Sequence, residues 1–188
     1  FDYQKDLIFA DTIISQIEEL DKYEIRKWII DLRDNRGGNV WAMLSGLTPI
    51  IGDGLINYSI RNKNEKANFI KQGNIAHSKA STSIYNTKLK FEKLAVLVNR
   101  HTASSGEMLA ISLLGFENTK SFGYKTSGLT TANTTFTFND GTSLFLATGF
   151  MADKNKKIYR NGITPDIIFD NSLSDEAILV KVKEWLNE

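Results

Sequence analysis

The stretch WIIDLRDNRGG, residues 28–38, decides the fold that this sequence predicts. Its first five residues form a short apolar run that is typical of a buried strand. Gly37 and Gly38 at its end favour a tight turn, because glycine tolerates backbone angles that other residues avoid. The apolar residues 40–47 then indicate a helix leaving that turn. A buried strand that continues through a turn into a helix is one unit of an α/β fold.

The same order recurs in the sequence LAVLVNRHTASSGEMLAISLL, residues 94–114. Residues 94–98 predict a second buried strand, residues 99–103 a turn, and residues 104–114 a helix. Two such strand–turn–helix units in a chain of 188 residues predict an α/β fold in one domain spanning residues 1–188.

The flanking segments predict further elements. Apolar residues at helical spacing indicate a helix over residues 8–20 and another after Ser174, which is suited to cap it. Residues 134–148 predict a β-hairpin around an Asn-Asp-Gly turn. We expect residues 52–90, which are polar and rich in Asn, Lys and Ser, to form an edge hairpin and loops.

Composition excludes several classes of protein. Apolar residues make up 41% and charged residues 24%, as in ordinary soluble globular proteins. The 23 basic and 22 acidic residues are mixed along the chain, so no basic stripe indicates a nucleic-acid partner. The absence of cysteine excludes a cysteine nucleophile, a thiolate metal site and a disulfide framework.

Ser104 is the candidate nucleophile. It follows a strand and begins a helix, where its hydroxyl is exposed and the unpaired N–H groups of the first turn favour developing negative charge. A tetrahedral intermediate needs two N–H donors about 3 Å from its oxyanion. We expect the backbone amides of Gly38 and Ser105 to supply them. A serine at this position is more often only a helix cap, and a Gly-Gly pair only a turn.

Three segments together carry a resemblance to a known family. They resemble motifs of the tail-specific (C-terminal-processing) serine proteases and occur in the same order as in that family. The D-L-R-x-N-x-G-G motif corresponds to residues 29–38, the nucleophile segment to residues 99–107, and the closing motif to the sequence GITPD of residues 162–166. The resemblance implies a ClpP/crotonase-like superhelical core of strand–turn–helix units. It also implies the roles that are assigned above to the serine and the two amides.

The sequence differs from the better-known branch of that family at the position of the general base. In that branch the base is a lysine in a T-x-G-K-G segment. The corresponding sequence here is TSGL, residues 126–129, so Leu129 stands at the lysine position. A leucine cannot accept a proton, and this excludes the Ser–Lys mechanism at that position.

The local sequence resembles most closely the Ser–His branch of the nisin-resistance type, in residues 37–39, 102–108 and 128–133. In that branch the catalytic histidine lies well upstream of the D-L-R segment. We therefore expect the general base to lie upstream of Phe1, the chain to be the C-terminal part of a longer protein, and this fragment alone to have no significant peptidase activity.

The other candidate groups are a glutamate, two histidines and a lysine. Glu107 lies on the same helix face as Ser104 and either orients an incoming histidine, lines the substrate site, or is only a first-turn glutamate favoured by the helix dipole. We expect the ring of His101 to point away from the hydroxyl and His77 to lie at the surface, so that both are dispensable. Lys125 is close in sequence but four positions from where the family lysine would be.

Asn39, Val40 and Trp41 follow the oxyanion glycine and are expected to lie along the substrate cleft. An exposed tryptophan there would bind an apolar side chain of a peptide. Packing in the core is an equally good interpretation of Val40 and Trp41.

The sequence thus predicts a serine endopeptidase that cleaves near the C-terminus of a peptide, for example a lantibiotic-type peptide, by acyl-enzyme chemistry. No cofactor, metal or nucleic acid is expected. By resemblance, the whole protein is expected to be extracellular or on the cell surface, anchored to the membrane only through an upstream segment. The alternatives are a non-catalytic relative that binds peptides or other ligands and a crotonase-type acyl-CoA enzyme, which would need no serine in residues 102–105.

Overall fold

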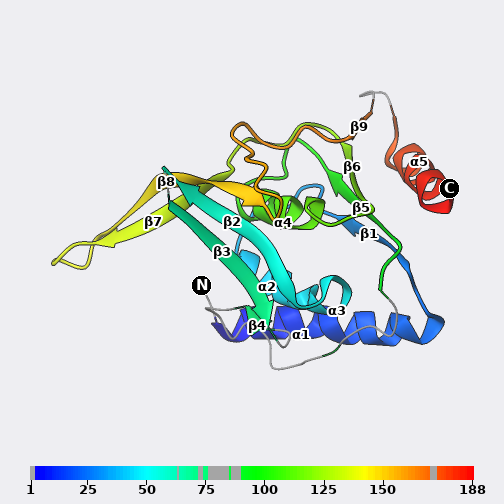
Figure 1. Cartoon of the computed structure of the whole chain (residues 1–188), viewed down its shortest axis with the longest axis horizontal. Helices are drawn as coiled ribbons and strands as arrows, with labels where there is room; N and C mark the ends of the chain where they lie inside the picture. Colours follow the sequence, from blue (N-terminus) through cyan, green and yellow to red (C-terminus); the bar gives the residue numbers. More distant parts are fainter. Residues whose placement is uncertain (1–2, 63, 72–73, 76–84, 86–89, 170–172) are drawn as a thin grey trace.

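A computed structural model describes residues 3–62, 64–71, 74–75, 85, 90–169 and 173–188. Its helices and strands are mixed along the chain and gather around two β-sheets (Figure 1). The predicted α/β class is therefore confirmed. His77 lies outside the described residues.

The first sheet is parallel and contains the two strands predicted from the apolar runs. Its order is β1-β5-β6-β9, comprising β1 (Lys27–Asp31), β5 (Lys93–Val98), β6 (Thr119–Gly123) and β9 (Ile167–Ile168). Asp31 pairs with Leu97, so β1 and β5 end at the same edge of the sheet. Leu94 to Val98 are fully buried, because helices cover both faces. The other strand predicted to be buried, β1, is only half-buried, because it lies at the edge of the sheet.

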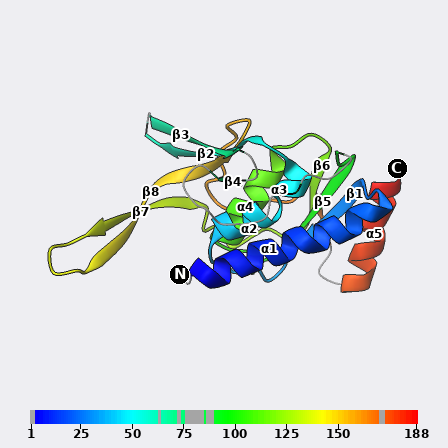
Figure 2. The same ribbon diagram turned by 90° about the horizontal axis from the view of Figure 1, so that it is seen from below.

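Among the described residues, four α-helices lie on one face of this sheet and one on the other. The first group consists of α1 (Tyr3–Leu20), α2 (Val40–Gly46), α3 (Thr48–Ile51) and α4 (Ser105–Leu114). Figure 2 shows α1 crossing beneath α2 and α3. Helix α5 (Asp175–Asn187) packs Ile178, Val182 and Leu186 against the opposite face.

The helix boundaries follow local signals. Helix α1 begins at Tyr3, five residues before the apolar pattern that predicted it, while a short 3-10 turn (Asp21–Tyr23) follows its end at Leu20. Helix α5 begins after Ser174, whose hydroxyl oxygen accepts a hydrogen bond from the Ala177 amide at 3.3 Å. The predicted N-cap is therefore confirmed. In the described part of the chain, no helix combines the length and apolar character needed to cross a membrane.

The second sheet is antiparallel. Its order is β4-β3-β2-β8-β7, comprising β2 (Gly54–Arg61), β3 (Asn64–Lys71), β4 (Asn74–Ile75), β7 (Thr131–Thr137) and β8 (Ser143–Asp153). The hairpin predicted within residues 52–90 is present as β2–β3, and together with β4 it forms one edge of this sheet, as expected. Its inner strand, β2, pairs with the distant β8.

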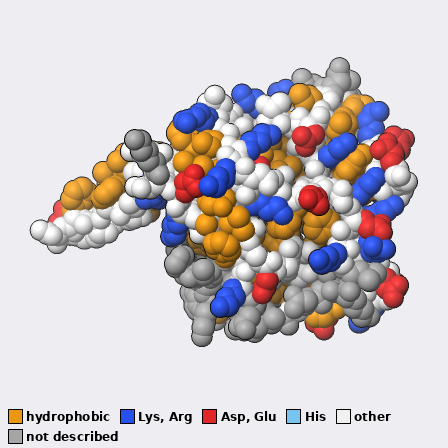
Figure 3. All heavy atoms as spheres, in the orientation of Figure 1, with side chains coloured by type: hydrophobic (Ala, Val, Ile, Leu, Met, Phe, Trp, Pro, Cys, Tyr) orange, Lys and Arg blue, Asp and Glu red, His pale blue; other side chains and the backbone are white. Residues whose placement is uncertain are grey.

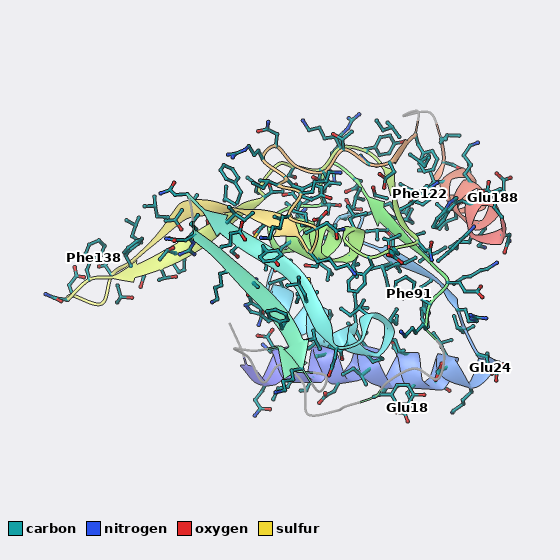
Figure 4. All side chains as sticks on the ribbon, viewed as in Figure 1. Glu18, Glu24, Phe91, Phe122, Phe138 and Glu188 are labelled. Carbon is teal, nitrogen blue, oxygen red and sulfur yellow. The ribbon has the colours of Figure 1, made fainter. Side chains whose placement is uncertain are left out.

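The hairpin β7–β8 turns at Asn139-Asp140-Gly141, as the sequence predicted. Its outer part projects from the body of the molecule, with hydrophobic atoms along it (Figure 3). Phe138 lies close to the tip (Figure 4), with 53% of its surface exposed. The base of this hairpin, in contrast, reaches back to the carboxyl ends of β1 and β5 and takes part in the site described next.

Candidate active site

The segments that follow β1 and β5 are joined by hydrogen bonds. The Thr102 hydroxyl donates to the Leu32 carbonyl at 2.8 Å, and the Ala103 amide donates to the Asn35 carbonyl at 2.9 Å. These bonds are possible because the two parallel strands end at the same edge. They bring the glycine turn of one unit against the helix start of the other.

Ser104 has a strained backbone. Its φ of 53° and ψ of −120° lie in a region that residues with a side chain rarely adopt. The residue is exposed and stands directly before α4. Gly106 permits this turn, because a Cβ atom there would lie 2.4 Å from the Asn35 carbonyl oxygen. A serine held exposed on a strained strand-to-helix turn is the arrangement of the serine nucleophile in α/β-hydrolases.

The glycine turn packs directly on Ser104. A Cβ atom at Gly37 would lie 3.1 Å from the Ser104 Cβ and 3.2 Å from the Ser105 amide nitrogen. The Ser105 hydroxyl donates to the Gly38 carbonyl at 2.8 Å. Among the described residues, the amides of Gly38 and Ser105 have no hydrogen-bond acceptor. Both are thus available to the oxygen of a substrate.

A cavity of about 560 Å³ opens in front of Ser104. This volume is within the range of roughly 300–1,000 Å³ that is usual for ligand pockets. Five of the predicted site residues besides Ser104 line it: Gly38, Asn39, Val40, Trp41 and Ser105. The structure therefore brings these predicted residues together in one place.

The three residues after the glycine turn differ in their contacts and burial. Asn39 caps α2, since its side-chain oxygen accepts from the Trp41 amide at 3.0 Å, and its amide group donates to Asp6 at 2.7 Å. Val40 is buried in the core, and Trp41 is half-buried against it. Val40 and Trp41 therefore fit both interpretations, packing in the core and lining of the cleft, since each packs on the core and also borders the cavity.

Glu107 lies underneath the cavity and does not line it. Its carboxylate is fully buried and accepts hydrogen bonds from four donors: the amides of Ser104, Gly128 and Leu129, and the Thr126 hydroxyl. Glu107 therefore ties the start of α4 to the loop 126–129. No histidine of the described residues contacts it.

The groups weighed as internal bases are not at Ser104. The His101 ring bonds the Asp34 carboxylate at 2.8 Å and lowers the pKa of Asp34, and it borders a different cavity. Lys125 is exposed and does not line the cavity in front of Ser104. Leu129, at the position of the family lysine, does line it. The ring of His101 points away from the site, as expected.

Sequence reasoning missed the wall that faces Ser104. It is formed by strands of the antiparallel sheet, which contribute these residues: Ser59, Arg61, Lys66, Asn68, Thr131, Ala132, Asn133, Thr135 and Met151. Alternation along β2 and β3 is the signal that could have grouped some of them, whereas a bulge between Ala132 and Asn133 breaks the alternation in β7. In the part of the chain that the structure describes, no cluster of three or more His, Asp or Glu residues could hold a metal ion.

Comparison with known proteins finds relatives among the peptidases. The family model of peptidase family S41 matches residues 6–169. A nisin-resistance protein of Lactococcus lactis is 37% identical over 156 residues, which are 81% of this chain and 49% of that protein. A "Probable CtpA-like serine protease" of Staphylococcus saprophyticus is 29% identical over 153 residues, or 81% of this chain and 29% of that protein.

Among solved structures, a lipoprotein from Streptococcus agalactiae superposes with a TM-score of 0.78 at 30% identity. The match covers 100% of this chain and 62% of the lipoprotein chain. The chain thus spans about half of the curated nisin-resistance protein, and less of the CtpA-like protein.

Proposed function

The chain belongs to peptidase family S41, a family of serine peptidases, and we propose that Ser104 is the nucleophile with which it cleaves peptides near their C-termini. The observation that carries this proposal is the strained, exposed Ser104, against which the glycine turn packs and whose cavity is also lined by Gly38 and Ser105, both with amides that are unpaired among the described residues. A serine that only caps a helix needs neither the strain nor the two adjacent amides.

The proposed reaction proceeds through an acyl-enzyme. The Ser104 hydroxyl oxygen attacks the carbonyl carbon of the scissile bond, while a general base accepts its proton. The carbonyl oxygen becomes negative and accepts hydrogen bonds from the Gly38 and Ser105 amides. The C–N bond then breaks, the base returns the proton to the leaving amine, and the acyl group remains on Ser104. Water, deprotonated by the same base, hydrolyses this ester and restores the hydroxyl.

We place the general base, a histidine, in a segment upstream of Phe1. The similarity to the nisin-resistance protein supports this position, since the Ser–His branch that the sequence resembles has its histidine there. The cavity supports it as well: of the described residues that line it, Lys66 alone carries an amine and none carries an imidazole. Lys66 is therefore the rival base that an experiment must test.

The relatives suggest the substrate class and location. Because a relative at 37% identity is a nisin-resistance protein, we propose a lantibiotic-type peptide as substrate. The similarity to a lipoprotein supports a location at the cell surface, with membrane attachment through an upstream segment.

A labelling experiment tests the nucleophile. We expect a fluorophosphonate to modify Ser104 in the chain extended upstream by the segment that carries the proposed histidine, and to modify the Ser104→Ala variant not at all. The matched control is Ser127→Ala, an exposed serine outside the cavity whose replacement should leave labelling unchanged. Equal labelling of the Ser104→Ala variant would remove Ser104 from the mechanism.

A cleavage experiment tests the base. Residues 1–188 alone should leave a C-terminally apolar peptide intact in mass spectrometry, whereas the upstream-extended chain should cleave it. In the extended chain, Lys66→Gln should keep kcat within about tenfold, since losing a true general base removes a factor of roughly 10²–10⁴. Robust cleavage by residues 1–188, lost in Lys66→Gln, would identify Lys66 as the base and contradict an upstream histidine.

A further inference from the structure

The charged side chains that line the cavity in front of Ser104 are all of one sign. Of the described residues that line it, Arg61 and Lys66 are the charged ones and both are cationic. Glu65, the acid next to Lys66, bonds Lys156 at 2.6 Å instead. Within the described part of the chain, neither Arg61 nor Lys66 forms an ion pair. The cavity therefore presents uncompensated positive charge to whatever binds there.

Arg61 is held in position by its surroundings. Its aliphatic stem crosses Gly149, where a Cβ atom would lie 2.6 Å from the Arg61 Cγ. Its guanidinium then donates to the Asn133 carbonyl on β7 at 3.3 Å. A guanidinium has five N–H groups in a planar fork that matches a carboxylate, so the remaining donors suit such a ligand.

We propose that Arg61, assisted by Lys66, binds the free α-carboxylate at the C-terminus of the peptide substrate. This inference rests on the proposed function and adds the feature by which the substrate end is recognised. Because the carboxylate site and Ser104 share one cavity of about 560 Å³, only a tail of a few residues fits between them. The distance from the C-terminus to the cleaved bond is then set by the cavity itself.

A binding assay tests this without requiring turnover. The protein is the Ser104→Ala variant, and the probes are three decapeptides with an N-terminal fluorophore and an otherwise uncharged sequence. One ends in a free carboxylate, one in an amide, and one in a glutamate whose α-carboxyl is an amide. Fluorescence anisotropy should show the free acid binding about 10- to 100-fold more tightly than the simple amide, the range expected for charge-assisted hydrogen bonds.

Variants locate the site. Arg61→Gln should make the acid and the simple amide bind equally, and Lys66→Gln should reduce the preference in part. The control is Lys71→Gln, which removes an exposed lysine of the same strand β3 outside the cavity and should keep the full preference. Circular dichroism verifies that each variant is folded.

Several outcomes would overturn the inference: no binding, equal binding of acid and simple amide, a preference that survives in Arg61→Gln, or equal binding of the glutamate probe and the free acid. The last would indicate a site for acidic side chains. The fluorophosphonate experiment separates this inference from the proposed function, because an unlabelled Ser104 contradicts the peptidase even when the preference for the free acid is found.

Discussion

Replacing Gly38 by alanine separates backbone strain from loss of an oxyanion donor. Gly38 has a φ of +134°, where a side chain is disfavoured, but an added Cβ would meet only the Met43 Cε, at an ordinary contact distance of 3.6 Å. The strain is therefore in the backbone and not in packing. Gly54 is a matched control, since its φ is +133° and an added Cβ would meet no heavy atom within 4 Å.

Both variants should lose similar stability. Forcing a residue with a side chain into such a conformation costs about 1–3 kcal/mol. For a chain of 188 residues, each 1 kcal/mol lowers Tm by roughly 2–4 °C. We therefore expect Gly38→Ala and Gly54→Ala to melt within a few degrees of one another, both below the parent, in a thermal scan followed by circular dichroism.

Their activities should differ. In the proposed mechanism the Gly38 amide must point at the substrate oxygen, and relief of the new strain will turn it away. We therefore expect kcat to fall about 10²–10³-fold, the loss seen when one oxyanion donor is removed. Gly54→Ala should keep kcat near the parent value. Peptide cleavage by the upstream-extended chain provides the measurement. Equal kcat values for the two variants would refute Gly38 as a donor, and unfolding of Gly38→Ala alone would refute the estimate of strain.

Three further predictions concern other parts of the molecule. Glu107→Gln should lower the free energy of unfolding by roughly 2–6 kcal/mol in urea titrations, because two of the four donors, which are buried or part-buried, lose their acceptor and each unsatisfied buried group costs about 1–3 kcal/mol. The exposed Glu117→Gln is the control, and a loss below about 1 kcal/mol would contradict the reasoning. His101→Ala should leave cleavage almost unchanged, while the pKa of Asp34, which the His101 hydrogen bond lowers, should rise toward its ordinary value in an NMR titration. The stabilisation that this bond provides is present above the ordinary pKa of an aspartate and is lost as pH falls through the lowered pKa. A collapse of kcat in this variant would instead make His101 the base. Phe145→Ser should change the free energy of unfolding by no more than about 0.5 kcal/mol, because this side chain on the projecting hairpin has 69% of its surface exposed. A larger loss would show that the side chain packs against another part of the protein in solution.

The sequence by itself determined the two strand–turn–helix units and the residues at their junctions. Residues 28–32 and 94–98 could be identified as strands because a predominance of apolar side chains is a local property of the chain. The burial that was expected of both holds for β5 but not for β1, since its place at the edge of the sheet depends on the tertiary structure. The proximity of the glycine turn to Ser104 followed, since parallel strands of one sheet end at the same edge. The family motifs in these segments strengthened the same conclusion.

Only the tertiary structure decided the opposite wall and the direction of individual side chains. Arg61 and Lys66 reach the cavity because β2 pairs with β8, about 90 residues later, and hydropathy does not encode which strands pair. Glu107 and His101 are each three residues from Ser104, yet one is buried below the cavity and the other faces Asp34. Spacing restricts such side chains to a face, but hydrogen-bond partners that are distant in sequence determine where they point.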